Sequence, residues 1–161
     1  MFQNNRKMEL LQRKLPRLSG FDYSLRNYYY VTFCTYQKSF LFGSPEKLNE
    51  FGGIVKKEIE KINEHFQDVS VDKYVVMPNH VHAIFKVGYH QNSTDEGFTN
   101  LSTAVGLLKS GISRKIHKID PDIKVWQKSF YDRIIRNELE YHRALNYIEE
   151  NPQKWNGVAD N

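Results

Sequence analysis

The segment VVMPNHVHAIF, residues 75–85, constrains the fold of this chain more than any other. Its apolar residues lead through Pro78 and Asn79 to two histidines, His80 and His82, that are one residue apart. Because side chains of a β-strand alternate between its two faces, both histidines would lie on one face of a sheet. The opposite face would carry four apolar side chains, those of Val81, Ala83, Phe85 and Val87. The pattern therefore predicts a strand with one face for the core and one for chemistry.

Apolar periodicity predicts the elements around this strand. It indicates strands at residues 28–36, 69–77, 80–88 and 123–131, and helices at residues 44–66, 101–116 and 132–151. We expect Ser44 to cap the first helix, Pro152 to end the last one, and the polar residues 89–98 to form a loop. This order is the ferredoxin-like, or split βαβ, arrangement followed by one more helix. The sequence predicts an α+β domain: a four-stranded antiparallel sheet, two helices on one face and an added C-terminal helix.

Length and composition bound the class of protein. A chain of 161 residues can bury a hydrophobic core as one domain, and its single cysteine, Cys34, excludes an internal disulfide. No apolar run is long enough to span a bilayer, and the amino terminus lacks the apolar core of a secretory signal. We therefore expect a cytoplasmic protein that has no membrane partner.

Positive charge is concentrated at the amino terminus. Residues 1–26 hold six Lys and Arg against two acidic residues, whereas residues 27–161 hold seventeen of each. We divide the chain into a basic arm, residues 1–26, and a single domain, residues 27–161. Such an arm attracts polyanions, although it can also be a solvated tail. The basic side chains predicted to contact single-stranded nucleic acid are Arg13, Lys14, Arg17, Arg26, Lys109, Arg114, Lys115, Lys128, Arg133 and Arg136.

The histidine pair favours a divalent metal ion over two solvated side chains, since neutral imidazole is a common metal ligand. If helices cover the apolar face of the sheet, the histidine face is left open for a substrate. A catalytic ion needs a further protein ligand, and the last predicted helix is its expected source. Tyrosine can act as a covalent nucleophile, and spacing alone does not choose among Tyr131, Tyr141 and Tyr147. We expect Tyr131 to project where that helix begins.

Several segments together resemble one protein family. They are RLSGFDYSLRNYYYVTFCTYQKSFLFG, KYVVMPNHVHAIF, LKSGISRKI and VWQKSFYDRIIRNELEYHRALNYIEENPQKW, and they span residues 17–155. The combination is similar to the single-tyrosine transposases of the IS200/IS605 type, and most similar to their REP-associated branch. The resemblance implies a ferredoxin-like fold, a homodimer, and cleavage and rejoining of single-stranded DNA at or near a hairpin. It implies that His80 and His82 hold Mg²⁺ or Mn²⁺ and that Tyr131 forms a 5′-phosphotyrosine link, which leaves a free 3′-OH.

One position departs from the family pattern. In related transposases a polar residue about one helical turn after the tyrosine completes the metal site, but Ile135 occupies that position after Tyr131. Asn137 and Glu138 are the nearest polar residues, whereas Tyr147 is followed four residues later by Asn151. We retain Tyr131 because FYDRIIR is the closer match.

Two other functions stay open at this point. The departure at Ile135 favours a domesticated, catalytically inactive nucleic-acid-binding protein of the same fold. A metal-dependent RNA-processing enzyme is the third hypothesis.

Overall fold

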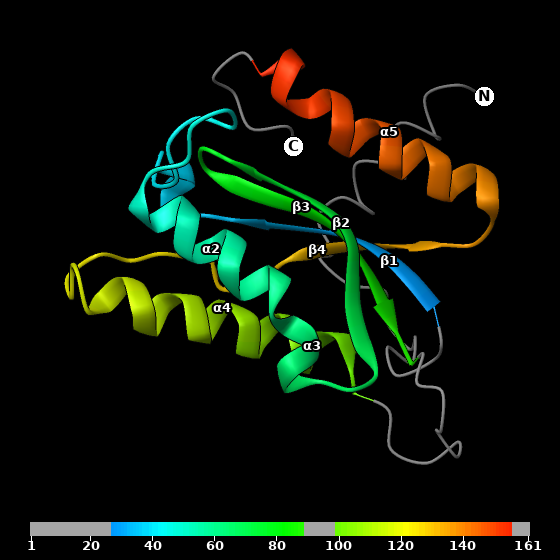
Figure 1. Ribbon diagram of the computed structural model, residues 1–161, viewed down its shortest axis with the longest axis horizontal. Helices are drawn as coiled ribbons and strands as arrows, with labels where there is room; N and C mark the ends of the chain where they lie inside the picture. The colour runs from blue at the N-terminus through cyan, green and yellow to red at the C-terminus, as the bar shows by residue number, and fades with distance from the viewer. Residues whose placement is uncertain (1–26, 89–98, 156–161) are drawn as a thin grey trace, which may run out of the picture.

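The computed structural model describes residues 27–88 and 99–155, which form one four-stranded sheet with helices on both of its faces (Figure 1). In chain order the elements are β1 (Asn27–Cys34), the 3₁₀ turn η1 (Tyr36–Lys38), α2 (Glu50–Glu60), α3 (Ile62–His65), β2 (Val69–Met77), β3 (His80–Val87), α4 (Leu101–His117), β4 (Tyr131–Ile135) and α5 (Glu138–Lys154). The strands lie in the order β2-β3-β1-β4, and every neighbouring pair is antiparallel. The predicted α+β, ferredoxin-like architecture with an added C-terminal helix is confirmed.

The two faces of the sheet are covered by different helices. In Figure 1, α2 and α4 lie on one side of the sheet and α5 crosses the other. The α2/α4 side holds the main core, which takes up Val81, Ala83, Phe85 and Val87 of β3, all fully buried. The α5 side holds a smaller cluster whose buried members are Ile84, Ile135, Ala144 and Ile148. The period-two pattern of β3 thus assigned its apolar face correctly.

The histidine face of β3 is not open, so that expectation is wrong. Only 1% of the His80 surface and 3% of the His82 surface is exposed. The cause is α5, whose apolar residues Ala144 and Ile148 pack against Ile84 two positions further along β3. The two histidines are therefore buried between the sheet and α5.

The first long helix begins five residues later than predicted, with its cap at Asn49 and not at Ser44. Ser44 closes a turn by accepting the backbone N–H of Lys47, and α2 starts after Asn49, whose side chain accepts the N–H of Gly52. The helix passes very close to the preceding segment at this point: a Cβ on Gly52 would lie 2.3 Å from the carbonyl oxygen of Phe42. A glycine in the first turn is what allows this approach.

The carboxyl-terminal elements are shifted relative to the prediction. The last strand does not span residues 123–131; β4 comprises Tyr131–Ile135, of which we expected residues 132–135 to be helical. Successive residues of a strand face opposite sides, so Ile134 enters the main core while Ile135 enters the α5 cluster. Neighbouring residues of a helix are only about 100° apart and would not face opposite sides of the sheet. The burial of Ile134 in one cluster and of Ile135 in the other therefore favours a strand.

Helix α5 also differs at its end. It begins after the cap Asn137 and continues through Pro152 to Lys154. Proline removes one backbone donor, and here that loss falls in the last turn, where the helix is about to end anyway. The prediction that Pro152 terminates the helix is wrong.

Some predictions lie outside the described residues. These are the basic arm at residues 1–26, with Arg13, Lys14, Arg17 and Arg26, and the loop at residues 89–98. In the part of the chain that is described, none of the helices has the length and apolarity needed to cross a membrane.

Candidate functional site

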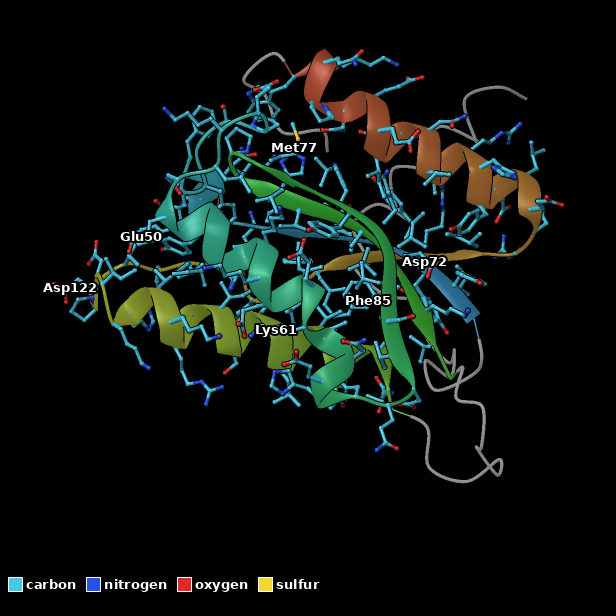
Figure 2. All side chains as sticks on the ribbon, viewed as in Figure 1. Glu50, Lys61, Asp72, Met77, Phe85 and Asp122 are labelled. Atoms are coloured by element: carbon cyan, nitrogen blue, oxygen red, sulfur yellow. The ribbon has the colours of Figure 1, made fainter. Side chains whose placement is uncertain are left out.

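Two imidazole rings, those of His80 and His82, lie next to each other at the start of β3. Nε2 of His80 lies 3.0 Å from Nε2 of His82, and the ring centroids are 4.5 Å apart. The strand geometry alone places both rings on the α5 side, because the residue between them, Val81, enters the main core. Figure 2 labels Met77, the residue of β2 that pairs with His80 and so marks this end of the sheet.

The other nitrogen of each ring is held by a neighbour. Nδ1 of His80 lies 2.7 Å from Oδ1 of Asn79, and the amide nitrogen of Asn79 donates to the Lys38 carbonyl at 3.3 Å. Because the amide is oriented by that second bond, Nδ1 of His80 is the donor and its Nε2 carries a lone pair. Nδ1 of His82 lies 2.8 Å from Oγ1 of Thr32, the residue opposite it on β1. A hydroxyl can donate or accept, so Thr32 allows either tautomer of His82.

The electrostatics keep His82 neutral. Burial, with a smaller effect of the neighbouring His80, lowers the pKa of His82 to about 3. Neutral imidazole is the form that binds metal ions. Adjacent ligands at about 2.1 Å from an octahedral ion are about 3.0 Å apart, which is the spacing of the two Nε2 atoms. The pair therefore fits two neighbouring ligands of a divalent ion.

Helix α5 and the residue that follows it cover this pair. The ring of Tyr147 lies 5.4 Å from that of His82, and the ring of Trp155, the C-cap of the helix, lies 5.8 Å from that of His80. Asn151 lies one helical turn after Tyr147 and is 6% exposed. It is therefore the buried amide of α5 that the helical spacing puts nearest to the two histidines.

The other predicted third ligands are distant. Asn137 caps the start of α5, and Glu138 is the next residue, 3.5 Å from the ring of His142. At 1.5 Å per residue, Asn137 lies about 20 Å along the helix from Asn151. Among the described residues, no group of three or more His, Cys, Asp and Glu side chains could hold a metal ion.

Tyr131 lies in β4 and not at the start of a helix. It pairs with Thr32, which in turn pairs with His82, so all three side chains share the α5 face. With strands about 4.8 Å apart, the Cα atoms of Tyr131 and His82 are separated by about 10 Å. Tyr131 is 48% exposed, and the argument from Ile135 at helical spacing does not apply to a strand.

Tyr147 is the candidate nucleophile that contacts the histidine pair. Its ring contacts both His82 and Tyr30, with centroids 5.4 Å and 6.1 Å away, and it is 40% exposed. Tyr141, by contrast, donates its hydroxyl to Asp72 at the far end of β2, a residue labelled in Figure 2. Of these two tyrosines of α5, Tyr147 is the one whose ring contacts a histidine of the pair.

The predicted DNA-contacting cations divide into two groups. Two of them have internal partners: the ammonium of Lys109 donates to the carbonyls of Gln127 and Ser129, and Lys115 pairs with Glu58. Burial lowers the pKa of Lys109 to about 8. Both belong to α4, on the side of the sheet away from the histidines, as does the exposed Arg114.

Arg133 is better placed for a phosphate. It pairs with Tyr30 across β4 and β1, and its guanidinium lies 5.8 Å from the Tyr30 ring. That ring stacks on His82 at 5.5 Å. The exposed Lys128 and Arg136 flank β4 at its two ends.

Three residues of the site were not identified from the sequence: Thr32, Asn79 and Trp155. Asn79 precedes the first histidine, but its role depends on the Lys38 carbonyl, which only the fold brings near. Thr32 becomes a partner of His82 only through the β1/β3 register. No sequence signal distinguishes Trp155 from an ordinary packed aromatic residue.

Comparisons with known proteins agree on one family. The profile of the family described as "Transposase IS200 like" matches residues 23–151. An uncharacterized protein of Haemophilus influenzae is 30% identical over 161 aligned positions, which cover 89% of each chain.

Two solved structures share the fold. A REP-associated tyrosine transposase bound to a REP hairpin has a TM-score of 0.64 at 19% identity, covering 88% of this chain and 76% of that one. A Deinococcus radiodurans protein assigned as a candidate transposase has a TM-score of 0.52 at 18% identity, covering 84% of this chain and 97% of that one. At these identities the likeness concerns the fold alone.

Proposed function

Because the chain belongs to the family of IS200-like transposases, we propose that it cleaves and rejoins single-stranded DNA through a covalent tyrosine link. The partner we propose is single-stranded DNA or DNA beside a hairpin. The structural neighbour bound to a REP hairpin supports that choice of partner. Mg²⁺ or Mn²⁺ as cofactor and a homodimer as the working unit belong to the same proposal.

The nucleophile we propose is Tyr147, in place of Tyr131. The observation that carries this choice is the contact between the Tyr147 ring and His82, with the buried Asn151 one turn further along α5. A nucleophile has to reach the phosphorus that the metal ligands position. Tyr131 lies on the same face but two strands away from His82. It is therefore a second candidate that the experiment below separates from Tyr147.

The donor set fits the proposed ion. His80, His82 and Asn151 would hold it through two imidazole nitrogens and one amide oxygen, which leaves positions for water and a phosphate oxygen. When bound, a divalent cation supplies positive charge to the scissile phosphate and to the charge that develops during displacement. Thr32 and Asn79 keep the two rings oriented through their Nδ1 atoms.

The covalent step exchanges one phosphodiester for another. The phenol oxygen of Tyr147 bonds to phosphorus, the bond from phosphorus to the 3′ oxygen breaks, and the phenolic proton is replaced overall by one on the leaving 3′-OH. The product is a 5′-phosphotyrosine. Attack by a 3′-OH on this link reverses the exchange and restores the phenol, so rejoining needs no nucleotide cofactor. The exposed guanidinium of Arg133 beside Tyr30 is placed to bind a neighbouring phosphate.

Trapping the covalent link tests this proposal. Purified protein is incubated with Mn²⁺ and 3′-labelled hairpin DNA whose single-stranded flanks are randomised, so no target sequence is assumed. We expect a labelled protein band that disappears in Tyr147→Phe and persists in Tyr131→Phe. Loss of the band in Tyr131→Phe alone would assign the nucleophile to Tyr131.

The same experiment separates the alternatives. A protein that binds the hairpins equally well in EDTA, yet yields no adduct with Mg²⁺ or Mn²⁺, is the catalytically inactive binder. An adduct formed with RNA hairpins in preference to DNA would favour RNA processing. His80→Ala is expected to abolish the adduct while retaining most of the DNA affinity, because the exposed cations lie elsewhere on the surface.

A further inference from the structure

The loop that follows β1 carries an exposed aromatic ring next to the candidate site. Phe40 is 63% exposed, and its ring lies 5.9 Å from the ring of Trp155 in an edge-to-face contact. Trp155 in turn lies 5.8 Å from His80. In Figure 1 this loop and the carboxyl end of α5 lie together at the same end of the sheet. An unbroken row of rings therefore leads from the histidine pair to the surface.

The loop is held in an unfavourable backbone conformation. Gln37 and Lys38 have φ values of 51° and 53°, and they are the non-glycine residues with positive φ among those described. Such residues cost of order 1 kcal/mol each and cluster at functional sites. The hydroxyl oxygen of Thr35 lies 2.8 Å from the Ser39 carbonyl oxygen and 3.0 Å from the Asn79 carbonyl oxygen, so its single proton is shared between two acceptors, which keeps the loop in this shape.

The loop is coupled directly to the metal-site strand. Asn79 donates to the Lys38 carbonyl and also orients His80. The position of Phe40 relative to the histidines is thus set by hydrogen bonds, and a ligand would not have to order it. Rigid placement of an exposed aromatic ring lowers the entropic cost of binding.

The charge of the loop suits a nucleic acid. Lys38 is exposed, and its backbone carbonyl accepts a hydrogen bond from the side-chain amide of Asn79, the residue before His80. The Lys38 side chain therefore belongs to the loop that borders the candidate site. Single-stranded nucleic acids are bound by this combination, in which cations follow the phosphates and aromatic rings stack on bases.

We propose that Phe40, backed by Trp155, is a stacking platform for one base of single-stranded DNA next to the phosphate held at the histidine pair. This inference rests on the proposed function, because it takes single-stranded DNA as the substrate. It adds a DNA contact at Phe40, which Trp155 separates from the histidine pair. It also gives the strained loop a role, which is to hold Phe40 in place. The platform would fix the register of the strand, since a stacked base cannot slide without losing its contact.

Binding measurements test the platform without requiring cleavage. A hairpin is selected by binding from the randomised pool in EDTA, and an abasic site is then placed at each position of its single-stranded flanks in turn. Wild-type protein should lose roughly 5- to 100-fold in affinity at one position, the range expected for one stacked base. Phe40→Leu keeps the apolar bulk but not the ring. It should bind the intact hairpin more weakly by the same factor and be indifferent to that abasic site.

Two further variants serve as controls. Phe40→Tyr keeps the ring and should restore both the affinity and the sensitivity to the abasic site. Leu107→Ala alters an exposed apolar residue of α4, on the other side of the sheet, and should bind as the wild type does.

Two results would overturn the platform: wild-type affinity in Phe40→Leu, or an undiminished abasic effect in that variant. Either result alongside a normal tyrosine adduct would reject the platform and leave the cleavage proposal intact. If Phe40→Leu removes the position-specific abasic effect but no tyrosine adduct forms, the platform is supported and the cleavage proposal is rejected.

Discussion

Thr32 places its hydroxyl oxygen 2.8 Å from Nδ1 of His82, the residue directly opposite it in the β1/β3 register. Nε2 of His80 carries a lone pair, because Nδ1 of that ring donates to Asn79. Without a cation, Nε2–H of His82 can donate to Nε2 of His80 across the 3.0 Å gap, while the Thr32 hydroxyl donates to Nδ1 of His82. With a cation, both Nε2 atoms must offer a lone pair to it. Nδ1 of His82 then carries the proton and donates it to the Thr32 oxygen. The threonine hydroxyl serves both states.

We predict that Thr32→Val weakens Mn²⁺ binding by about 10- to 100-fold, the usual cost of losing an outer hydrogen bond to a metal-bound histidine. Isothermal titration calorimetry on the DNA-free protein measures this directly. Thr32→Ser keeps the hydroxyl and is expected to bind Mn²⁺ as tightly as the wild type. Equal weakening in both variants would mean that packing of the methyl group matters and the hydroxyl does not.

Asn151 provides a test of the third ligand. We expect Asn151→Leu to lose Mn²⁺ affinity and the tyrosine adduct together, since leucine has a similar volume and no ligand atom. Asn151→Asp keeps an oxygen at the same place and adds a charge, so it should bind Mn²⁺ at least as tightly as the wild type. Wild-type affinity in Asn151→Leu would remove Asn151 from the donor set.

Gly52 and Gly53, adjacent at the start of α2, allow a controlled comparison of two Gly→Ala variants by their free energies of unfolding. A Cβ at Gly52 would lie 2.3 Å from the Phe42 carbonyl oxygen, whereas a Cβ at Gly53 meets nothing within 4 Å. Gly52→Ala should lower the free energy of unfolding by about 1–3 kcal/mol through forced backbone movement. Gly53→Ala should raise it by about 0.5–1 kcal/mol through reduced freedom of the unfolded chain. Urea denaturation of the two variants should therefore give shifts of opposite sign.

Lys109 should leave a signature in the pH dependence of stability. Its pKa is lowered by burial to about 8, below the ordinary value of 10.5. Between these two values the unfolded chain binds more protons than the folded one, so this group makes stability rise with pH over that range. The free energy of unfolding of the wild type, minus that of Lys109→Met, should increase from pH 8 to pH 10.5. A flat difference would show that the ammonium is not desolvated in the folded state.

The sequence predicted correctly those features that depend on residues close together in the chain. The burial of Val81, Ala83, Phe85 and Val87 follows from alternation within one strand, and the structure confirms it. The same alternation put His80 and His82 on one face. It could not predict that this face is covered, because the covering residues lie more than sixty positions later in α5.

The error at residues 131–135 has a different cause. DRIIRNELE has the composition of a helix, and its helical pattern is genuine from Glu138 onward. What selects the strand is pairing with β1 and the division of Ile134 and Ile135 between two separate clusters. At residues 132–135 these tertiary contacts outweigh the intrinsic helix propensity of the segment. The argument that Ile135 follows Tyr131 by one helical turn depended on that boundary, so the error in secondary structure became an error in the ligand argument.

Helix α5 contributes no residue to the main core, yet it carries Tyr147 and Asn151. Scaffold and cutting machinery are thus separable parts of one chain. A stop codon before residue 138 would remove the proposed nucleophile and one proposed ligand while sparing the residues through which the sheet packs on α2 and α4. A chain shortened in this way is the one we expect to bind DNA without cutting it.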